Sequence, residues 1–168
     1  MLERNLKGGR VKPADLPKGP NGRPCCRWCG RETAPPRRTF CSAACVNEHK
    51  IRTSNSYAKR QLYLRDRGVC RLCGLDTKVV AEELWEVRLL QGEGQERLTK
   101  RLHGIPVSRK VWRRKYGGGL WDMDHILAVR DGGGQAGLSG LQTLCIPCHR
   151  RRTAEQRRAR ATRPAASP

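Results

Sequence analysis

The sequence predicts a small α+β protein, and three observations lead to this fold class. Two segments, residues 42–52 and 54–67, have the composition and end residues of helices. Residues 120–130 and 138–144 are typical of two strands around a glycine-rich turn at 131–134, and Pro147 then starts another helix. Nine cysteines stand in a chain of 168 residues that is only 37% hydrophobic. A core this small needs cross-links, and the cysteines can supply them.

The elements divide the chain into four parts. Residues 1–24 hold four prolines and four glycines without periodicity, so we expect a flexible basic arm. Residues 25–53 contain a compact group of cysteines and the first helix. Residues 54–160 form the main domain, with a partly helical, polar insertion at about 77–119. Residues 161–168 are expected to be a disordered tail.

The two early helices have definable ends. Ser42 follows Cys41 and is the expected N-cap of the first helix. The second helix begins with Ser54 or Asn55 as its cap and continues to Arg67. Gly68 then provides the stop, because glycine adopts the left-handed conformation that commonly follows a helix.

The charge of the chain indicates a polyanionic partner. Lysine and arginine number 35 against 15 aspartates and glutamates, a formal net charge of +20. Nucleic acid fits this excess, because basic surfaces gain affinity when counterions leave the phosphates. An arginine-favouring genome composition is the alternative source of the charge. The N-terminal residues have no apolar run typical of a signal peptide, and no stretch is typical of a membrane span. The expectation is therefore an intracellular protein, cytoplasmic and nucleoid-associated, without a membrane partner.

One set of four cysteines predicts a structural zinc site. Cys70 and Cys73 form one C-x-x-C pair, and Cys145 and Cys148 form another. Two such pairs complete a tetrahedral zinc site with no open position for a substrate. Such a site would hold the helix before Cys70 against the strands and helix around Cys145. The alternative is a set of unrelated free thiols.

A second set predicts a zinc finger near the N-terminus. Its ligands are Cys26, Cys29, Cys41 and Cys45, spaced as C-x-x-C followed by C-x-x-x-C. Cys25 is left over and could replace Cys26, and His49 could replace Cys45 from the following helix turn. We prefer the four cysteines and interpret His49 as an ordinary polar helix residue. The finger either contacts DNA or only stabilises the fold.

The stretch "WDMDHILAVRDGGG" carries the candidate chemistry. Asp124 and His125 are neighbours, so on a regular strand they point to opposite faces, although a bulge could direct both into one cavity. His149 follows Cys148 in the last helix and can approach Asp124. A carboxylate and an imidazole are suitable ligands for a divalent ion, which leaves His125 as a general base. A surface Asp-His pair in a plain zinc module is the alternative.

These motifs resemble the zinc-stapled HNH nucleases, which have a ββα-metal core. The match rests on "GVCRLCG", on "DHI" with its glycine turn, and on "LQTLCIPCHRRRT", and it covers residues 56–158. With "RRTFCSAACVNEHKIRTSNSY" upstream, the chain also resembles the C-terminal nuclease module of zinc-finger, Ran-binding-domain annealing helicases and its stand-alone bacterial and phage relatives. A bacterial or phage origin is accordingly suspected. No helicase or nucleotide-binding motif is present in this sequence.

The resemblance implies a role for each candidate residue. Asp124 would bind the catalytic ion, Mg²⁺, Mn²⁺ or similar, with His149 as its second ligand, and His125 would activate water. The four cysteines at 70, 73, 145 and 148 would hold the structural zinc of the family. One position departs from the pattern, because Gly140 stands where the family has an asparagine that buttresses the catalytic loop. The loss of that side chain predicts a slower enzyme.

The last helix predicts a nucleic-acid contact. Residues three and four apart share a helix face, so polar and basic side chains extend along one side from His149. The candidates are Arg150, Arg152, Gln156, Arg157 and Arg160. The leading hypothesis is a metal-dependent DNA endonuclease of low sequence specificity with a possible preference for branched DNA, and with no prediction of oligomeric state. The alternative, motivated by Gly140, is a zinc-dependent nucleic-acid-binding protein with little or no catalytic activity.

Overall fold

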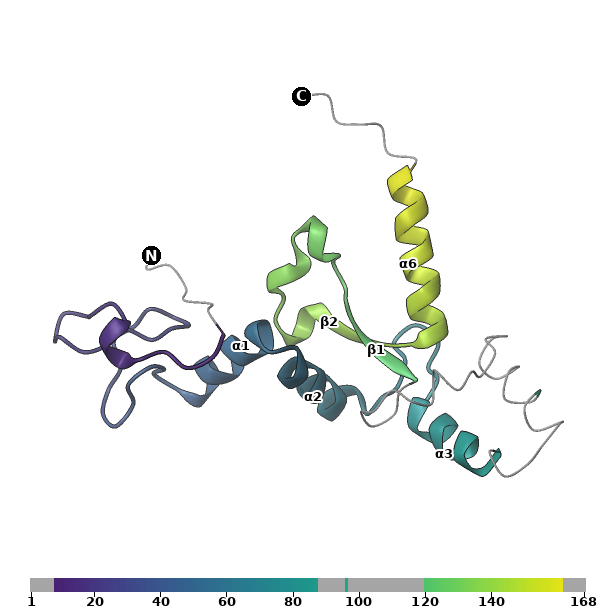
Figure 1. Ribbon diagram of the computed structural model, residues 1–168, viewed down its shortest axis with the longest axis horizontal. Coiled ribbons are helices and arrows are strands. Elements are labelled where there is room, and N and C mark those ends of the chain that lie inside the picture. The colour runs from purple at the N-terminus through teal and green to yellow at the C-terminus, as the bar shows by residue number, and fades with distance from the viewer. Residues whose placement is uncertain (1–7, 88–95, 97–119, 162–168) are drawn as a thin grey trace. The chain divides into compact units, whose positions relative to one another are not determined.

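The structure is a computed structural model that describes residues 8–87, 96 and 120–161 (Figure 1). Most of the predicted insertion after residue 87 and the expected tail at 162–168 lie outside the described residues. The chain divides into two compact units. The first comprises Met1–Gln61 and Leu127–Gly140, and the second comprises Leu62–Ile126 and Leu141–Pro168.

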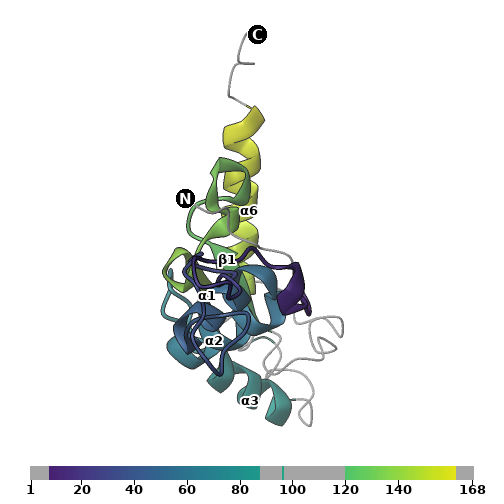
Figure 2. The ribbon, with the colours of Figure 1, turned by 90° about the vertical axis from the view of Figure 1, so that its left-hand side faces the viewer.

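The first unit contains loops, short turns and one complete α-helix. A 3-10 turn, η1, spans Pro13–Asp15, and α1 spans Ala43–Thr53 (Figures 1 and 2). The Ser42 hydroxyl accepts a hydrogen bond of 3.1 Å from the Cys45 backbone N–H, which confirms Ser42 as the N-cap. The segment from 127 to 140 adds three further 3-10 turns: η2 (Val129–Asp131), η3 (Gly133–Gln135) and η4 (Leu138–Gly140).

Much of the segment expected to be a flexible arm is hydrogen-bonded to the cysteine-rich loops. The Cys25 backbone N–H donates to the Pro17 carbonyl at 2.7 Å, and Lys18 and Pro24 form an isolated β-bridge. The Glu32 carboxylate accepts from the Arg23 backbone N–H at 2.7 Å. The structure therefore differs from the expectation for residues 8–24. This segment has no periodic apolar residues, but hydrogen bonds between backbone groups hold it in a defined conformation.

Helix α2 spans Asn55–Asp66 and begins as the sequence predicts. The Ser54 hydroxyl accepts from the Tyr57 backbone N–H, which makes Ser54 the cap rather than Asn55. At the other end, Arg67 has a φ of 54° and Gly68 a φ of 82°. Two successive left-handed residues therefore end the helix, and the glycine is the expected stop.

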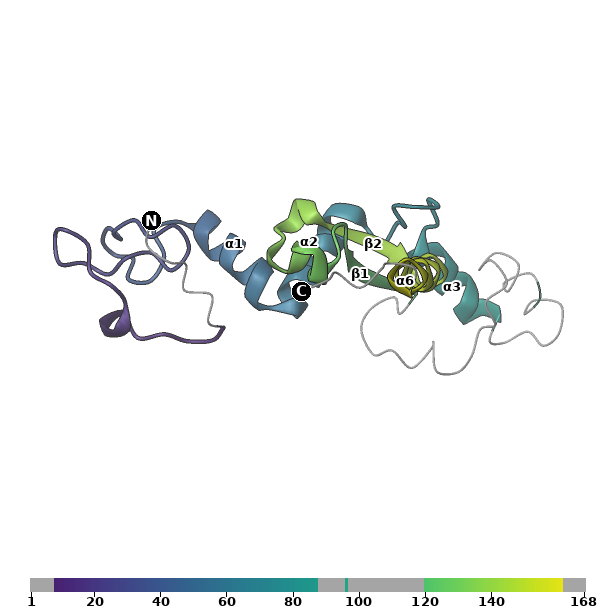
Figure 3. The ribbon, with the colours of Figure 1, turned by 90° about the horizontal axis from the view of Figure 1, so that it is seen from above.

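The second unit contains a two-stranded antiparallel sheet with helices around it. Strand β1 (Trp121–His125) pairs with β2 (Leu141–Cys145), so that Asp124 lies opposite Gln142. Helix α6 (Ile146–Ala161) follows β2 without a loop, and Figure 3 shows it end-on beside the two strands. Helix α3 spans Thr77–Val87. This arrangement confirms the predicted α+β class.

Both strands are shorter than predicted. The expected strands over 120–130 and 138–144 are replaced by five-residue strands, and 3-10 turns occupy most of the chain between them. Gly132 adopts a φ of 97°, and a Cβ on Gly133 would lie 1.9 Å from the Leu127 carbonyl oxygen. The backbone therefore turns tightly where the apolar residues Ile126, Leu127 and Val129 suggested a longer strand.

The core of the second unit is small and includes cysteines. Leu144, Cys70, Cys145 and Cys148 are buried together, and Leu75 packs against them. The aromatic rings of Tyr63 and Trp121 stack with centroids 6.1 Å apart. No helix among the described residues has the length and apolar composition needed to cross a membrane.

Candidate nuclease site and cysteine clusters

The first cysteine cluster gathers the four preferred finger residues. The Sγ atoms of Cys26, Cys29, Cys41 and Cys45 all lie within 4.8 Å of one another. The Sγ of Cys41 is 3.4 Å from that of Cys29 and 3.4 Å from that of Cys45. A tetrahedral zinc site with Zn–S bonds of about 2.3 Å has sulfur atoms about 3.8 Å apart. This cluster could therefore hold a zinc ion.

Neither of the two substitutes considered for the finger joins this cluster. Cys25 is buried, but its thiol is not among the four that could share an ion. His49 is buried and packs edge-on against Phe40, with ring centroids 5.1 Å apart. Its Nδ1 atom is 3.3 Å from the Thr53 hydroxyl. The preference for four cysteines over His49 agrees with this cluster, although the His49 side chain is buried and not on an exposed helix face.

The second cluster joins segments that are far apart in the sequence. The Sγ atoms of Cys70, Cys73, Cys145 and Cys148 also lie within 4.8 Å of one another, and those of Cys73 and Cys145 are 3.7 Å apart. The turn at Cys70 is hydrogen-bonded to β2, because the Arg71 backbone N–H donates to the Thr143 carbonyl at 2.9 Å. The long separation between the two pairs does not prevent a set of four that could hold zinc.

The thiols within each cluster differ in acidity. Burial raises the pKa of Cys29, but hydrogen bonds from Arg31 and neighbouring thiols outweigh it and leave the value at about 6. Burial and the neighbouring thiols raise the pKa of Cys41 to about 12. In the second cluster, backbone hydrogen bonds outweigh burial and lower the pKa of Cys70 to about 7, while burial raises that of Cys148 to about 11. Metal binding would therefore displace protons from the less acidic thiols.

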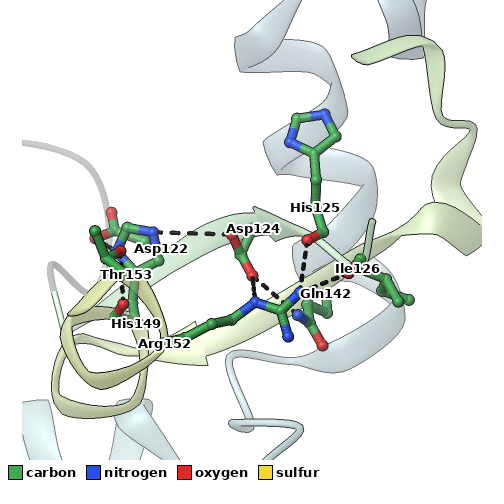
Figure 4. Close-up of polar contacts among 8 residues, drawn as sticks. All are labelled: Asp122, Asp124, His125, Ile126, Gln142, His149, Arg152 and Thr153. Carbon is green, nitrogen blue, oxygen red and sulfur yellow. Dashed lines mark hydrogen bonds and ion pairs between the residues drawn. The ribbon is translucent and has the colours of Figure 1, made fainter. Parts of the chain in front are cut away.

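An acidic group lies where β1 faces α6 (Figure 4). Asp122 and Asp124 occupy alternate positions of β1, so their side chains share one face of the strand. His149, in the first turn of α6, lies between them. Its Nδ1 is 3.4 Å from the Asp122 carboxylate, and its Nε2 is 3.9 Å from the Asp124 carboxylate. Asp122 and Asp124 thus face opposite nitrogens of one partly exposed imidazole ring.

Asp124 has two further partners. The Gln142 side-chain amide donates a hydrogen bond of 2.9 Å to one carboxylate oxygen of Asp124. The Arg152 Nε lies 2.9 Å from the same oxygen. The Arg152 guanidinium also donates to the backbone carbonyls of His125 and Ile126. Strand β1 is therefore fixed to α6 through the ion pair that neutralises Asp124.

His125 does not share this position. β1 pairs regularly with β2 from Trp121 through His125, and the His125 ring points away from Asp124 (Figure 4). No bulge of β1 directs both side chains into one cavity, because the ladder continues to the end of the strand. The opposite orientation expected of neighbouring strand residues is what the structure has.

The five predicted nucleic-acid contacts on α6 fall into two classes. Arg150, Arg157 and Arg160 are exposed, whereas Arg152 and Gln156 are half-buried on the face that includes His149 and Thr153. Arg152 is engaged with Asp124, so its guanidinium is not directed along the helix towards solvent as a phosphate contact would require. Arg150, Arg157 and Arg160 are accessible to a ligand, and their contact with phosphate stays a prediction.

Comparison with known proteins decides the family. The HNH endonuclease family matches residues 112–155. The mouse protein named "DNA annealing helicase and endonuclease ZRANB3" is 36% identical over 155 residues, which cover 83% of this chain and 14% of the mouse protein. The human protein of the same name is 33% identical over 156 residues, with the same coverage. The chain belongs to the HNH endonuclease family. The HNH resemblance inferred from the sequence is thereby confirmed.

This HNH chain spans only 14% of the length of the curated relatives that it matches. The crystal structure of the human ZRANB3 HNH domain is 32% identical in sequence, with a TM-score of 0.45. That match covers 65% of this chain and 94% of the crystallised one.

Gly140, the departure from the HNH pattern, is closely packed. A Cβ at this position would lie 2.6 Å from the Cβ of Ala136, closer than two such atoms approach. An asparagine at 140 would therefore force the turn to move. The Gln142 side chain, two residues further along, contacts Asp124. Replacing Gly140 with the asparagine of the family therefore carries a steric cost at Ala136.

Sequence reasoning missed Asp122 and the position of Arg152. Side chains two residues apart in a strand lie on the same face. Asp122 and Asp124 have this separation in "WDMDH", so Asp122 could have been inferred from the sequence. Arg152 lies one helical turn after His149, so its guanidinium could extend into solvent or contact β1. The packing of α6 against β1 decides between these two positions.

Proposed function

We propose that this protein is a metal-dependent DNA endonuclease of low sequence specificity with selectivity for branched structures. The observation that carries the proposal is that His149 of α6 lies next to Asp124 of β1, at 3.9 Å, with His125 adjacent to Asp124 in the same strand. The name of the ZRANB3 relatives, "DNA annealing helicase and endonuclease", includes both DNA and an endonuclease. Family membership and a net charge of +20 support the same partner.

The acidic group suits a hard divalent ion. Carboxylate oxygens and imidazole nitrogen are ligands for such ions, and two negative charges next to one another favour a cation. Asp124 and His149 would hold the ion, and Asp122 is an additional donor from the same strand face. When bound, the ion would neutralise a phosphate oxygen and stabilise the departing 3′ oxygen. Arg152 now neutralises Asp124, so an ion would share or replace that partner.

His125 would act as the general base. Its ring points away from the ion pair of Asp124 and is partly exposed, so a water molecule can reach a ring nitrogen. Proton transfer from that water to His125 would generate the nucleophile for in-line attack on phosphorus. The products would carry a 5′ phosphate and a 3′ hydroxyl. Gln142 would orient Asp124, and the backbone contacts of Arg152 would fix the end of β1.

Two structural zinc ions complete the proposal. The cysteines at 26, 29, 41 and 45 would hold one ion, and those at 70, 73, 145 and 148 the other. The second ion would stabilise the start of α6, because Cys145 and Cys148 flank that start and His149 follows directly. The exposed arginines 150, 157 and 160 would contact DNA phosphates, with Gln156 beside them.

The ion pair between Arg152 and Asp124 favours a second candidate function. A carboxylate that is already neutralised suits a module without a catalytic ion, which binds nucleic acid through its basic surface without cutting it. This alternative retains both zinc ions and the DNA partner. It differs from the first in predicting no divalent-ion-dependent cleavage.

Plasmid nicking separates the two functions. Supercoiled DNA is incubated with the wild type, with His125→Ala and with Val129→Ala, in a series of Mg²⁺ or Mn²⁺ concentrations. We expect His125→Ala to nick about 100-fold to 10,000-fold more slowly, the usual contribution of a general base. Val129 is exposed in the loop after β1, so its replacement is the matched control for surface and folding effects.

DNA binding, measured by fluorescence anisotropy without the divalent ion, should be the same for all three proteins. Equal nicking by the wild type and His125→Ala would exclude His125 as the base. Binding without nicking by the wild type at every ion concentration would support the second function instead.

A further inference from the structure

The first unit contains a cavity that the nuclease proposal does not use. Its volume is about 610 Å³, and residues from four stretches line it: the segment at 9–10, the finger loops, α1 and the start of α2. Arg10, Arg27, Lys50 and Arg60 contribute four cationic side chains to this lining. No carboxylate is among the lining residues in the part of the chain that the structure describes. Like charges repel, so their convergence favours an anionic occupant.

Two of these cations are held in place by aromatic rings. The Arg27 guanidinium lies 5.4 Å from the centroid of the Phe40 ring and donates to the Gly9 carbonyl at 3.2 Å. The Lys50 ammonium lies 5.3 Å from the centroid of the Tyr57 ring. Rings hold a cation through their electron-rich faces without neutralising its charge. These contacts help to fix the positions of the two cationic groups in the lining.

Arg27 is deeply buried for a cation, with an exposed fraction of 5%. Burial lowers the pKa of its guanidinium, since the charged form loses hydration. A bound anion would add a charged partner to the cations that line the cavity. Arg10, Lys50 and Arg60 are exposed, so the cavity combines an internal cation with accessible ones at its rim.

The start of α2 contributes a further positive potential. Ser54, Ser56 and Tyr57 belong to the cap and first turn of this twelve-residue helix, and all three line the cavity. The first backbone N–H groups of a helix carry partial positive charge and commonly bind phosphate. Helix end, cationic side chains and cavity therefore combine in one place.

We propose that this cavity is a second nucleic-acid contact, separate from the nuclease site, which binds a backbone phosphate group of a DNA strand. The anion site follows from the geometry of the first unit alone, whereas its assignment to DNA rests on the proposed function. A phosphodiester presents one negative charge and acceptor oxygens that match guanidinium and ammonium donors. The site gives affinity without sequence preference, because phosphates are common to all sequences.

Two pairs of basic residues in the same unit allow a matched test. Lys50→Gln with Arg60→Gln removes two exposed cations from the cavity, and it leaves the buried Arg27 untouched so that folding is preserved. Arg37→Gln with Arg38→Gln removes the same charge from exposed positions outside the cavity. Zinc content and circular dichroism should agree for both double variants and the parent protein.

The measurement is equilibrium binding of a fluorescent duplex at several salt concentrations, made in the His125→Ala background without divalent ions. We expect the cavity variant to reduce the slope of log affinity against log salt by about 1 for each lost phosphate contact. The control pair should change the slope by much less. The measurement needs no cleavage, so it tests the cavity even if the protein proves not to be a nuclease. Equal slopes for the two double variants would overturn the cavity proposal.

A second experiment distinguishes a backbone phosphate from a terminal phosphate as the ligand. The same oligonucleotide is compared with and without a 5′ terminal phosphate, and inorganic phosphate is tested as a competitor against chloride at equal ionic strength. A backbone site binds both oligonucleotides equally, and this equality is the expected result. A preference for the phosphorylated end that disappears in the cavity variant would overturn the backbone assignment in favour of a terminal phosphate.

Discussion

The two units each combine a four-cysteine cluster with a charged site, but the charges have opposite sign. In the first unit, four cations line a cavity beside α1 and the start of α2. In the second, two carboxylates and a histidine lie between β1 and α6. A phosphate can bind the first site directly, whereas the second presents carboxylates, one of them paired with Arg152, and suits a phosphate once a divalent cation is bound. One site is therefore suited to hold DNA and the other to act on it.

The largest expected effect comes from removing one zinc ligand from the cysteine cluster of a single unit. Cys145→Ser removes a ligand from the second cluster, and metal binding at such sites is worth about 10–16 kcal/mol of folding free energy in small zinc domains. We expect loss of one zinc ion per chain and loss of nicking, measured by elemental analysis and plasmid assay. Cys25→Ser is the matched control, since Cys25 is buried but outside both clusters. Unchanged zinc content in Cys145→Ser would refute the second zinc site.

The next effect concerns the acidic site alone. Asp124→Asn preserves the size of the side chain and removes its charge. Replacing a residue that only contacts a metal ligand typically lowers activity by up to about 100-fold. Replacing the ligand itself should therefore lower the nicking rate by at least about 100-fold. DNA affinity should stay the same or rise, because a negative charge is lost near the phosphate. Asp122→Asn should have a smaller effect, since Asp124 also faces His149 and is held by Gln142. Equal activity of Asp124→Asn and wild type would exclude Asp124 as a ligand.

A smaller effect tests the competition between Arg152 and the divalent ion. Arg152→Gln removes the cation that now neutralises Asp124, so the Mn²⁺ concentration for half-maximal nicking should fall several-fold. The maximal rate should fall too, because the contacts of Arg152 with the backbone at 125 and 126 are lost. Arg158→Gln, on the exposed side of α6, controls for net charge. A higher Mn²⁺ requirement in Arg152→Gln would show that Arg152 assists ion binding.

The smallest effect is on stability and involves neither charged site. The Asp66 carboxylate accepts hydrogen bonds from Arg65 and from the Thr143 hydroxyl at 2.8 Å. Burial alone would raise the pKa of Asp66, but these hydrogen bonds outweigh it and lower the pKa below its ordinary value. The carboxylate therefore stabilises the fold at neutral pH, and this contribution is lost as the pH falls through its lowered pKa.

Asp66→Asn should reduce the free energy of unfolding at pH 7 by about 1–2 kcal/mol, the size expected for hydrogen bonds to a charged group. Chemical denaturation at pH 7 and at acid pH measures this. The difference between mutant and wild type should shrink at acid pH. A difference that is independent of pH would show that the charge of Asp66 contributes nothing.

Much of the fold and part of the candidate site could be predicted from local sequence. Ser42 and Gly68 mark helix ends because capping depends on a few neighbouring residues. The two sets of four cysteines follow from their spacing. The strand lengths could not be predicted, because Gly132 and Gly133 turn the backbone through contacts with the carbonyl of Leu127. Asp122 could have been found from strand alternation alone.

By itself, the sequence determined the charge of the chain, its helix ends, the residue types that could bind a metal and the family to which the chain belongs. These properties depend on residue identity and on the separation between nearby residues. Only the tertiary structure decided which side chains meet. The packing of α6 against β1 brings His149 and Arg152 to Asp124 from 25 and 28 positions away in the chain. Likewise, Arg10, Arg27, Lys50 and Arg60 have no recognisable common spacing, and they form one cationic cavity because loops and helices fold around the same space. Contacts between distant segments depend on how elements pack, and no local pattern encodes that information.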